Sequence, residues 1–184
     1  GKIKSCIIPM SCSWATDLRY ASAKQIQTDL YKSLDGLYEK LKTASSDTTF
    51  IAIGYPNVIS ENDDSCAPNV LLNGVERRYA VELVNYMNVT IKAVAAKHKI
   101  KYLDISDSLQ GDRLCDESYD GKAVQALALG DDYGVPIIVS TPFGPKEFYV
   151  GFGAESYHPT HTGHQMIASK VRGYLGSGNI ANCG

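Results

Sequence analysis

Thr48-Thr49-Phe50-Ile51-Ala52-Ile53-Gly54-Tyr55-Pro56 is a β-branched and apolar run that ends abruptly in turn-forming residues. Such a composition predicts a buried strand over residues 48–53, halted by the Gly-Tyr-Pro turn. A second run, Ile100-Lys101-Tyr102-Leu103-Asp104-Ile105, predicts another strand about fifty residues further along the chain. These two strands set the fold, because long segments with a helical pattern precede and follow the first of them.

Amphipathic helices flank the first strand. Between Ala23 and Lys42 the apolar residues recur at intervals of three or four, at Ile26, Leu30, Leu34, Leu37, Tyr38 and Leu41. The same spacing predicts a second helix from Val75 to His98, and a last helix over Gln165 to Leu175 with its apolar residues toward a core. An order of helix, strand, helix, strand with short connections predicts an α/β fold with a parallel sheet covered by helices.

Between Ser106 and Gly153 the periodicity fades, and Gly, Asp and Tyr are frequent. We expect a short helix over 122–129, a strand or extended segment over 135–140, and a lid or substrate-facing loop overall. A parallel sheet usually has about five strands, so two covered strands leave an edge without a neighbour. We therefore expect the sheet to be incomplete in this chain alone.

Composition excludes several classes of protein. The chain has 184 residues, which favours a single domain over 1–184, and 44% hydrophobic with 21% charged residues is ordinary for a globular protein. Its formal net charge of -2 gives no electrostatic basis for binding nucleic acid. The longest apolar runs fall far short of the roughly 20 residues that span a bilayer, so we expect no transmembrane segment.

The cysteines favour disulfides over a metal site. Five cysteines stand at positions 6, 12, 66, 115 and 183, without a Cys-x-x-Cys pair or a zinc-like spacing. Two bridges and one free thiol allow 15 patterns (five choices of the free cysteine times three pairings). We favour Cys6 with Cys12 and Cys66 with Cys115, as in a secreted or extracytoplasmic protein. Cys183 is then either a free thiol or the partner of a thiol elsewhere.

Three of the four histidines lie in the segment Glu155-Ser156-Tyr157-His158-Pro159-Thr160-His161-Thr162-Gly163-His164, just before the last helix. Pro159 disfavours a helical conformation at His158, and Gly163 is expected to permit a close turn into the helix. His158 should thus lie on a loop at the helix entrance. There an imidazole can act as a general base, with a carboxylate three residues earlier bound to its other ring nitrogen.

The motif Glu155-x-x-His158-Pro159-x-x-x-Gly163-His164 resembles the last conserved block of the SGNH (GDSL) esterase and lipase family, usually Asp-x-x-His-Pro. The Phe50 to Pro56 segment, Tyr102 to Ile105 and Leu114-Cys115 are similar to successive elements of its secreted, disulfide-containing branch. The resemblance covers most of the chain. It implies a three-layer α/β/α sandwich with a flavodoxin-like parallel sheet, and hydrolysis of a small carboxylic ester through an acyl-serine intermediate, without a cofactor or metal.

By the same resemblance His158 is the catalytic base, and Glu155 orients it, although a backbone carbonyl does this in some family members. The family's Gly-Asp-Ser and Gly-x-Asn-Asp motifs are absent, so the chain resembles the C-terminal portion of such a domain. We therefore expect a missing N-terminal segment or a complementary N-terminal chain to supply the nucleophilic serine, and this chain alone to be inactive. Ser5, Ser11 and Ser13 lack the strand-to-helix elbow that a nucleophile needs.

Two other functions are compatible with the sequence. One is a non-catalytic binding module that has kept the sandwich without the nucleophile. The other is a metal-dependent hydrolase in which His158, His161 and His164 bind a transition metal, since imidazole suits zinc, copper and nickel. Against the metal site, the spacing differs from His-Glu-x-x-His, and Pro159 with Gly163 keeps the three rings off one continuous helix.

Overall fold

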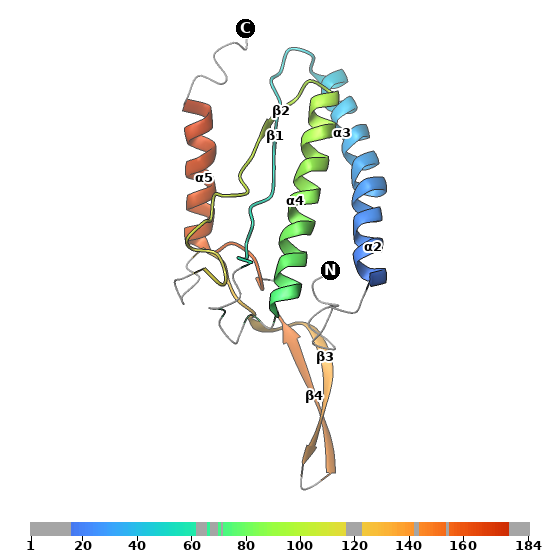
Figure 1. The fold of residues 1–184 in the computed structure, drawn as a ribbon, viewed down its shortest axis with the longest axis vertical. Coiled ribbons are helices and arrows are strands. Elements are labelled where there is room, and N and C mark those ends of the chain that lie inside the picture. Colours follow the sequence, from blue (N-terminus) through green and yellow to red (C-terminus); the bar gives the residue numbers. More distant parts are fainter. Residues whose placement is uncertain are drawn as a thin grey trace.

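The structure, a computed structural model, describes residues 16–61, 66, 70, 72–116, 123–141, 144–153 and 155–176 (Figure 1). The elements follow in the order α2 (Thr16–Gln25), η1 (Ile26–Leu30), α3 (Tyr31–Ala44), β1 (Ile51–Ile53), α4 (Gly74–Lys97), β2 (Lys101–Leu103), β3 (Leu129–Thr141), β4 (Gly144–Phe152) and α5 (His161–Gly176). The predicted Cys6–Cys12 bridge, Cys183 and the serines at 5, 11 and 13 lie outside the described residues.

The helix predicted over 23–42 is confirmed and is longer, because α2, η1 and α3 follow one another without a break from Thr16 to Ala44. The five residues of η1 form a π-helix in its middle. Ile26 and Tyr38 are buried as the apolar periodicity requires. Leu37 is the exception, since its side chain is 49% exposed although it was expected in the buried stripe.

The second long helix, α4, matches the prediction of 75–98 within one residue at each end. Asn73 begins it with a capping box: its side-chain oxygen accepts hydrogen bonds from the amides of Val75 and Glu76, at 3.0 and 3.1 Å. The Glu76 carboxylate in return accepts one from the Asn73 amide, at 2.9 Å. A cap of this kind is worth about 1 kcal/mol, because it satisfies amides that have no partner within the helix.

Strands β1 and β2 pair in parallel, with Ile51, Ala52 and Ile53 opposite Lys101, Tyr102 and Leu103. The two predicted strands are therefore confirmed, although each is only three residues long. Pairing continues past the strands: the Gly54 amide donates to the Leu103 carbonyl at 3.0 Å, and a parallel bridge joins Ile59 to Leu114. The two segments thus run side by side well beyond the regular sheet.

Two apolar clusters hold the helices to this sheet. One contains Tyr38 of α3, Ala52 of β1 and Val94 of α4. The other contains residues that follow β1 and β2, with Met166 and Ile167 of α5 packed against it. In Figure 1 the two strands accordingly lie between α5 and the pair α3 and α4. The fold is mixed α/β with a small parallel sheet, which confirms the α/β class that the sequence predicted.

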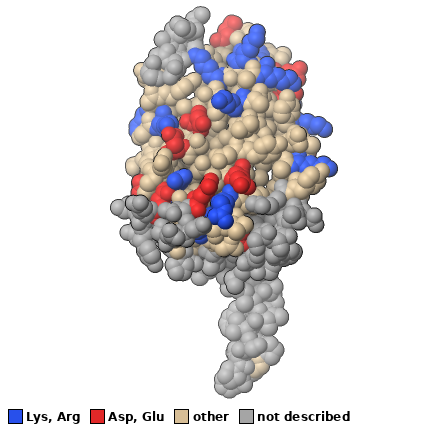
Figure 2. Space-filling view, in the orientation of Figure 1, with Lys and Arg blue, Asp and Glu red and all other residues tan. Residues whose placement is uncertain are grey.

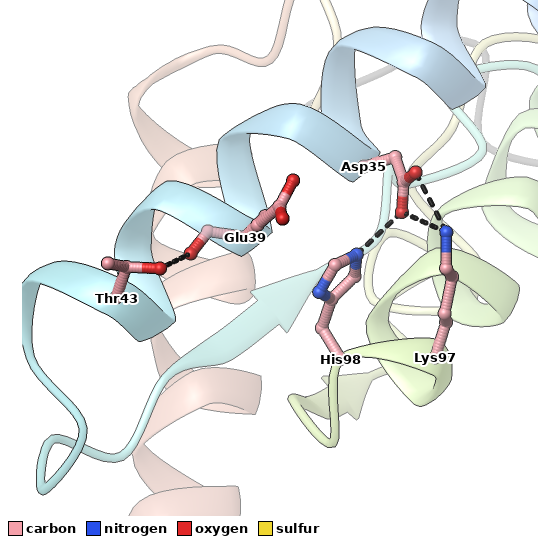
Figure 3. Close-up of polar contacts among 5 residues, drawn as sticks. All are labelled: Asp35, Glu39, Thr43, Lys97 and His98. Atoms are coloured by element: carbon pink, nitrogen blue, oxygen red, sulfur yellow. Dashed lines mark hydrogen bonds and ion pairs between the residues drawn. The ribbon is translucent and has the colours of Figure 1, made fainter.

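A charged cluster adds a contact between α3 and α4 (Figure 3). The Asp35 carboxylate accepts two hydrogen bonds from Lys97 Nζ, both at 2.8 Å, and lies 2.6 Å from His98 Nε2. The hydrogen bonds from Lys97 and then from His98 lower the pKa of Asp35. Because the Lys97 side chain is exposed and Asp35 is only partly buried, the cluster contributes little to stability.

The prediction for the region from Ser106 to Gly153 is partly wrong. Residues 123–128 form no helix; their backbone instead pairs with the segment before α5, through a bridge from Val124 to Pro159. Leu109 and Leu114 are buried in the core, so residues 106–116 are no lid. Tertiary pairing has overridden a weak local helical preference.

The strand predicted over 135–140 is confirmed within β3, which pairs with β4 as an antiparallel hairpin. Val135 lies opposite Val150, and Thr141 lies opposite Gly144 next to the turn. Figure 1 shows the hairpin projecting from the end of the molecule at which α4 and α5 begin. It is separate from the parallel sheet formed by β1 and β2.

The last helix begins at His161, four residues before the predicted start. Met166 and Ile167 pack on the core as expected, but Leu175 is 40% exposed.

The predicted Cys66–Cys115 disulfide is confirmed, with 4.3 Å between the two Cα atoms. Within the described ranges, none of the helices is long and apolar enough to cross a membrane. Basic and acidic side chains are interspersed over the face drawn in Figure 2.

Candidate active site

His158 lies on a loop two residues before Thr160, the last residue ahead of α5, as its position before Pro159 predicted. Backbone hydrogen bonds fix this loop against the segment at residues 123–125. The Gln125 amide donates to the His158 carbonyl and the Thr160 amide to the Ala123 carbonyl, both at 2.9 Å. These two hydrogen bonds fix the backbone of the loop at His158 and Thr160, while the His158 side chain remains exposed.

The His158 ring is oriented by a main-chain carbonyl. Its Nδ1 lies 3.0 Å from the carbonyl oxygen of Ser156. A carbonyl can only accept a hydrogen bond, so Nδ1 carries the proton. In the neutral ring Nε2 is then the free acceptor, which is the tautomer that a general base requires.

Glu155 shares this turn, and its own carbonyl accepts a hydrogen bond from the His158 amide at 3.0 Å. Its carboxylate, however, lies over Gly153: a Cβ added to that glycine would stand 2.4 Å from Glu155 Oε1. Among the residues that the structure describes, the carboxylate makes no hydrogen bond with the His158 ring. Of the two orienting groups that the sequence left open, the ring contacts the carbonyl, supplied by Ser156.

Tyr157, between Ser156 and His158, shapes the turn. Its φ of 62° is in the left-handed region, which costs a non-glycine residue of order 1 kcal/mol and is sparsely populated. The side chain offsets this cost, because its hydroxyl donates a hydrogen bond to the Val70 carbonyl and its ring packs on the core. Burial raises the pKa of Tyr157 to about 12. Sequence reasoning missed this residue, since nothing local indicates a left-handed tyrosine.

Gly163 does not form the turn into the helix that the sequence predicted. It lies inside α5, and a Cβ there would stand 2.1 Å from the Ala123 carbonyl oxygen. The residue is therefore needed for the close approach of α5 to the segment that clamps the His158 loop, and not for a turn into the helix. This contact was invisible in the sequence, because Ala123 is forty residues away.

The other two histidines of this segment, His161 and His164, lie on α5. The His161 ring contacts the Gln165 side chain, with 2.9 Å between His161 Nε2 and Gln165 Nε2, and the His164 side chain is exposed. Over the described ranges there is no group of three histidine, cysteine, aspartate or glutamate side chains that could hold a metal ion. The predicted alternative of a metal site formed by His158, His161 and His164 gains no support from this geometry.

The loop that carries Cys115 is stabilised by a buried carboxylate. Asp116 Oδ2 accepts hydrogen bonds from the amides of Gly111 and Arg113, at 2.9 and 3.0 Å, and the Arg113 guanidinium binds both carboxylate oxygens, at 3.0 and 3.1 Å. Burial by itself would raise the pKa of Asp116, but the hydrogen bonds and the charge of Arg113 outweigh it and lower that pKa. The Cys66–Cys115 bridge is thus anchored next to an internal ion pair.

Two solved structures of secreted or lipid-hydrolysing bacterial proteins have a similar fold. Phospholipase A1 from Streptomyces albidoflavus NA297 superposes with a TM-score of 0.62 at 18% identity over 92% of this chain. An extracellular lipase from Streptomyces rimosus does so with a TM-score of 0.60 at 16% identity over 91% of this chain. The matches span only 62% and 63% of those two proteins. No family model and no curated protein sequence matches the chain.

Proposed function

We propose that this chain is the catalytic-histidine portion of an SGNH-type serine hydrolase that cleaves small carboxylic esters. The observation that carries the proposal is the His158 ring, exposed on a clamped loop, with Nδ1 3.0 Å from a carbonyl oxygen and Nε2 without a hydrogen-bond partner among the residues that the structure describes. The lipase-like fold supports the same reaction class, although a shared fold does not by itself establish an activity.

In this mechanism His158 Nε2 takes the proton of a serine hydroxyl while the serine oxygen attacks the ester carbonyl carbon. The imidazolium then returns the proton to the departing alcohol, which leaves an acyl-serine. In the second half of the cycle Nε2 activates a water molecule, which hydrolyses the acyl-serine. The reaction needs no cofactor.

The orienting group in this proposal is the Ser156 carbonyl. It holds the proton on Nδ1 and stabilises the imidazolium through the N–H donor that persists in both protonation states. The Glu155 carboxylate, which lies over Gly153, is the secondary candidate for orientation. A carbonyl suffices for geometry, because what a base needs is a fixed ring and the correct tautomer.

The serine comes from outside the described part of this chain. Within it, no serine hydroxyl lies at hydrogen-bond distance from His158 Nε2. We propose that a complementary N-terminal polypeptide supplies the serine together with further strands, which would complete a flavodoxin-like three-layer sandwich in which 1–184 is part of one domain. The limited coverage of the two bacterial structures supports this, since each contains chain with no counterpart here.

An extracytoplasmic location fits the same proposal. The Cys66–Cys115 bridge requires an oxidising compartment to persist, and one of the similar structures is an extracellular lipase.

The test is to isolate the native protein with every polypeptide that accompanies it and to treat the assembly with a fluorophosphonate that labels activated serines. We expect one serine in a companion polypeptide to be labelled, and His158→Ala to slow the labelling by at least a hundredfold. His161→Ala is the matched control and should label at the native rate. A native protein that consists of this chain alone, folded and monomeric, contradicts the proposed companion.

The same experiment separates the non-catalytic alternative. A binding module would leave every serine of the complete assembly unlabelled. Labelling that requires an intact His158 but survives a chelator would also exclude the metal-dependent alternative.

A further inference from the structure

A cavity of about 490 Å³ lies between α4 and the continuous helix formed by α2, η1 and α3, away from the His158 loop. Its wall on the first helix includes Ser22, Ile26 and Leu30, four residues apart along one row. Across from them are Leu83, Val84 and Met87 of α4. None of the residues around His158 lines this space, so it is a separate feature of the molecule.

The cavity is graded from polar to apolar. Gln25, Asp29 and Ser33 lie on the neighbouring row of the same helix, line the cavity and are exposed, so they form a polar rim. The interior is aliphatic, because Ile26 is buried and Met87 packs against the core cluster that contains Tyr38. Small-molecule sites have this composition: apolar walls, a few placed polar groups, and a volume of several hundred Å³.

One polar group is buried inside. Ser22 is 3% exposed and lines the cavity, and its hydroxyl has no hydrogen-bond partner among the described residues. A buried hydroxyl without a partner costs free energy, which a ligand can recover by bonding to it. The wall beside it is the π-helix η1, and π-helical turns occur frequently at functional sites.

We propose that this cavity binds one molecule of a neutral single-chain amphiphile, with its alkyl chain along the Ile26, Leu83 and Val84 walls and its hydroxyl or ester group hydrogen-bonded to Ser22. An alkyl chain fits because the interior wall is apolar apart from Ser22. A neutral polar end fits because Asp29, whose exposed carboxylate lies on the rim, repels an anion. The site is independent of the proposed ester hydrolysis, since it shares no residue with the His158 loop.

The test is calorimetric titration of the full 184-residue chain with 1-decanol. We expect saturable binding at one site, with a Kd on the order of tens of micromolar. The heat capacity change should be negative, because apolar surface is buried. In a series from hexanol to decanol the affinity should rise about fourfold with each methylene group. Heats that do not saturate, or a flat chain-length series, overturn the proposal.

Variants locate the site. Val84→Trp fills the cavity and should abolish decanol binding. The matched control is Val89→Trp on the same helix, where the native side chain is 63% exposed and outside the cavity, and binding should be unchanged. Ser22→Ala should weaken binding about threefold to tenfold, by loss of one hydrogen bond. Circular dichroism checks each fold. Equal affinity of native protein, Val84→Trp and Ser22→Ala overturns the proposal even if decanol binds.

Decanoate tests whether a negative charge on the ligand weakens binding. Decanoate should bind more weakly than decanol, and Asp29→Asn should reduce that difference. If decanoate binds as tightly as decanol, the assigned ligand class is wrong. Loss of decanol binding in an assembly with a companion polypeptide would mean that this cavity receives protein side chains, and would also overturn the proposal.

Discussion

The Nδ1 atom of His158 lies 3.0 Å from the carbonyl oxygen of Ser156, and the carboxylate of Glu155 lies over Gly153. In the proposed enzyme a peptide group therefore does the task that a carboxylate does in many serine hydrolases. A peptide carbonyl cannot be removed by substitution, so its contribution has to be measured through the side chains around it.

Glu155→Gln should lower kcat for a short-chain ester by less than about tenfold, because the carbonyl still holds the ring. His158→Ala should lower kcat by about a thousandfold or more, because the base itself is lost. Both are measured in the complete assembly, with thermal unfolding as the check on folding. If Glu155→Gln is as inactive as His158→Ala, the carboxylate is the orienting group.

Tyr157→Phe removes only the hydroxyl that donates to the Val70 carbonyl. We expect the free energy of unfolding to fall by about 1 to 3 kcal/mol, because a carbonyl loses its partner next to the core. Tyr20→Phe is the control, since Tyr20 is 70% exposed, and it should change stability by less than about 0.5 kcal/mol. Urea unfolding measures both. An unchanged stability in Tyr157→Phe would show that the hydrogen bond does not hold the turn.

Two glycines of α5 should respond in opposite directions to the same substitution. Gly163→Ala forces a methyl group against the Ala123 carbonyl and should destabilise the protein by about 2 kcal/mol or more. The methyl group of Gly173→Ala meets no atom of the described residues within 4 Å, so this change should stabilise the protein by about 0.5 to 1 kcal/mol, by improving helix propensity. Thermal unfolding compares them. A neutral Gly163→Ala would contradict the close contact between α5 and residue 123.

Asp116 should make stability fall in acid. Its pKa is lowered in the folded protein, so its contribution is fully present above the unfolded-state pKa and is lost as pH falls through the folded-state pKa. Asp116→Asn should therefore be less stable than the native protein at pH 7, and the difference should shrink toward pH 2. Urea unfolding at both pH values provides the measurement, with the exposed Asp107→Asn as control. A difference that grows in acid would reverse the sign that we assign.

The sequence by itself determined the features that depend on neighbouring residues. The helices over 23–42 and 75–98 were predictable because their apolar residues recur every three or four positions. The two strands were predictable because short apolar runs stop at turn residues. The His158 loop was predictable from Pro159, and the Cys66–Cys115 bridge from its turn-rich surroundings.

Only the tertiary structure decided the features that depend on distant partners. Residues 123–128 form no helix because their backbone pairs with the turn around His158, and Gly163 is required by a carbonyl forty residues away. The contact of the Ser156 carbonyl with His158 could not be predicted from the sequence, because every residue has a main-chain carbonyl. Periodicity records which face of a segment is apolar, whereas close approach and main-chain hydrogen bonding depend on what the fold brings against that face.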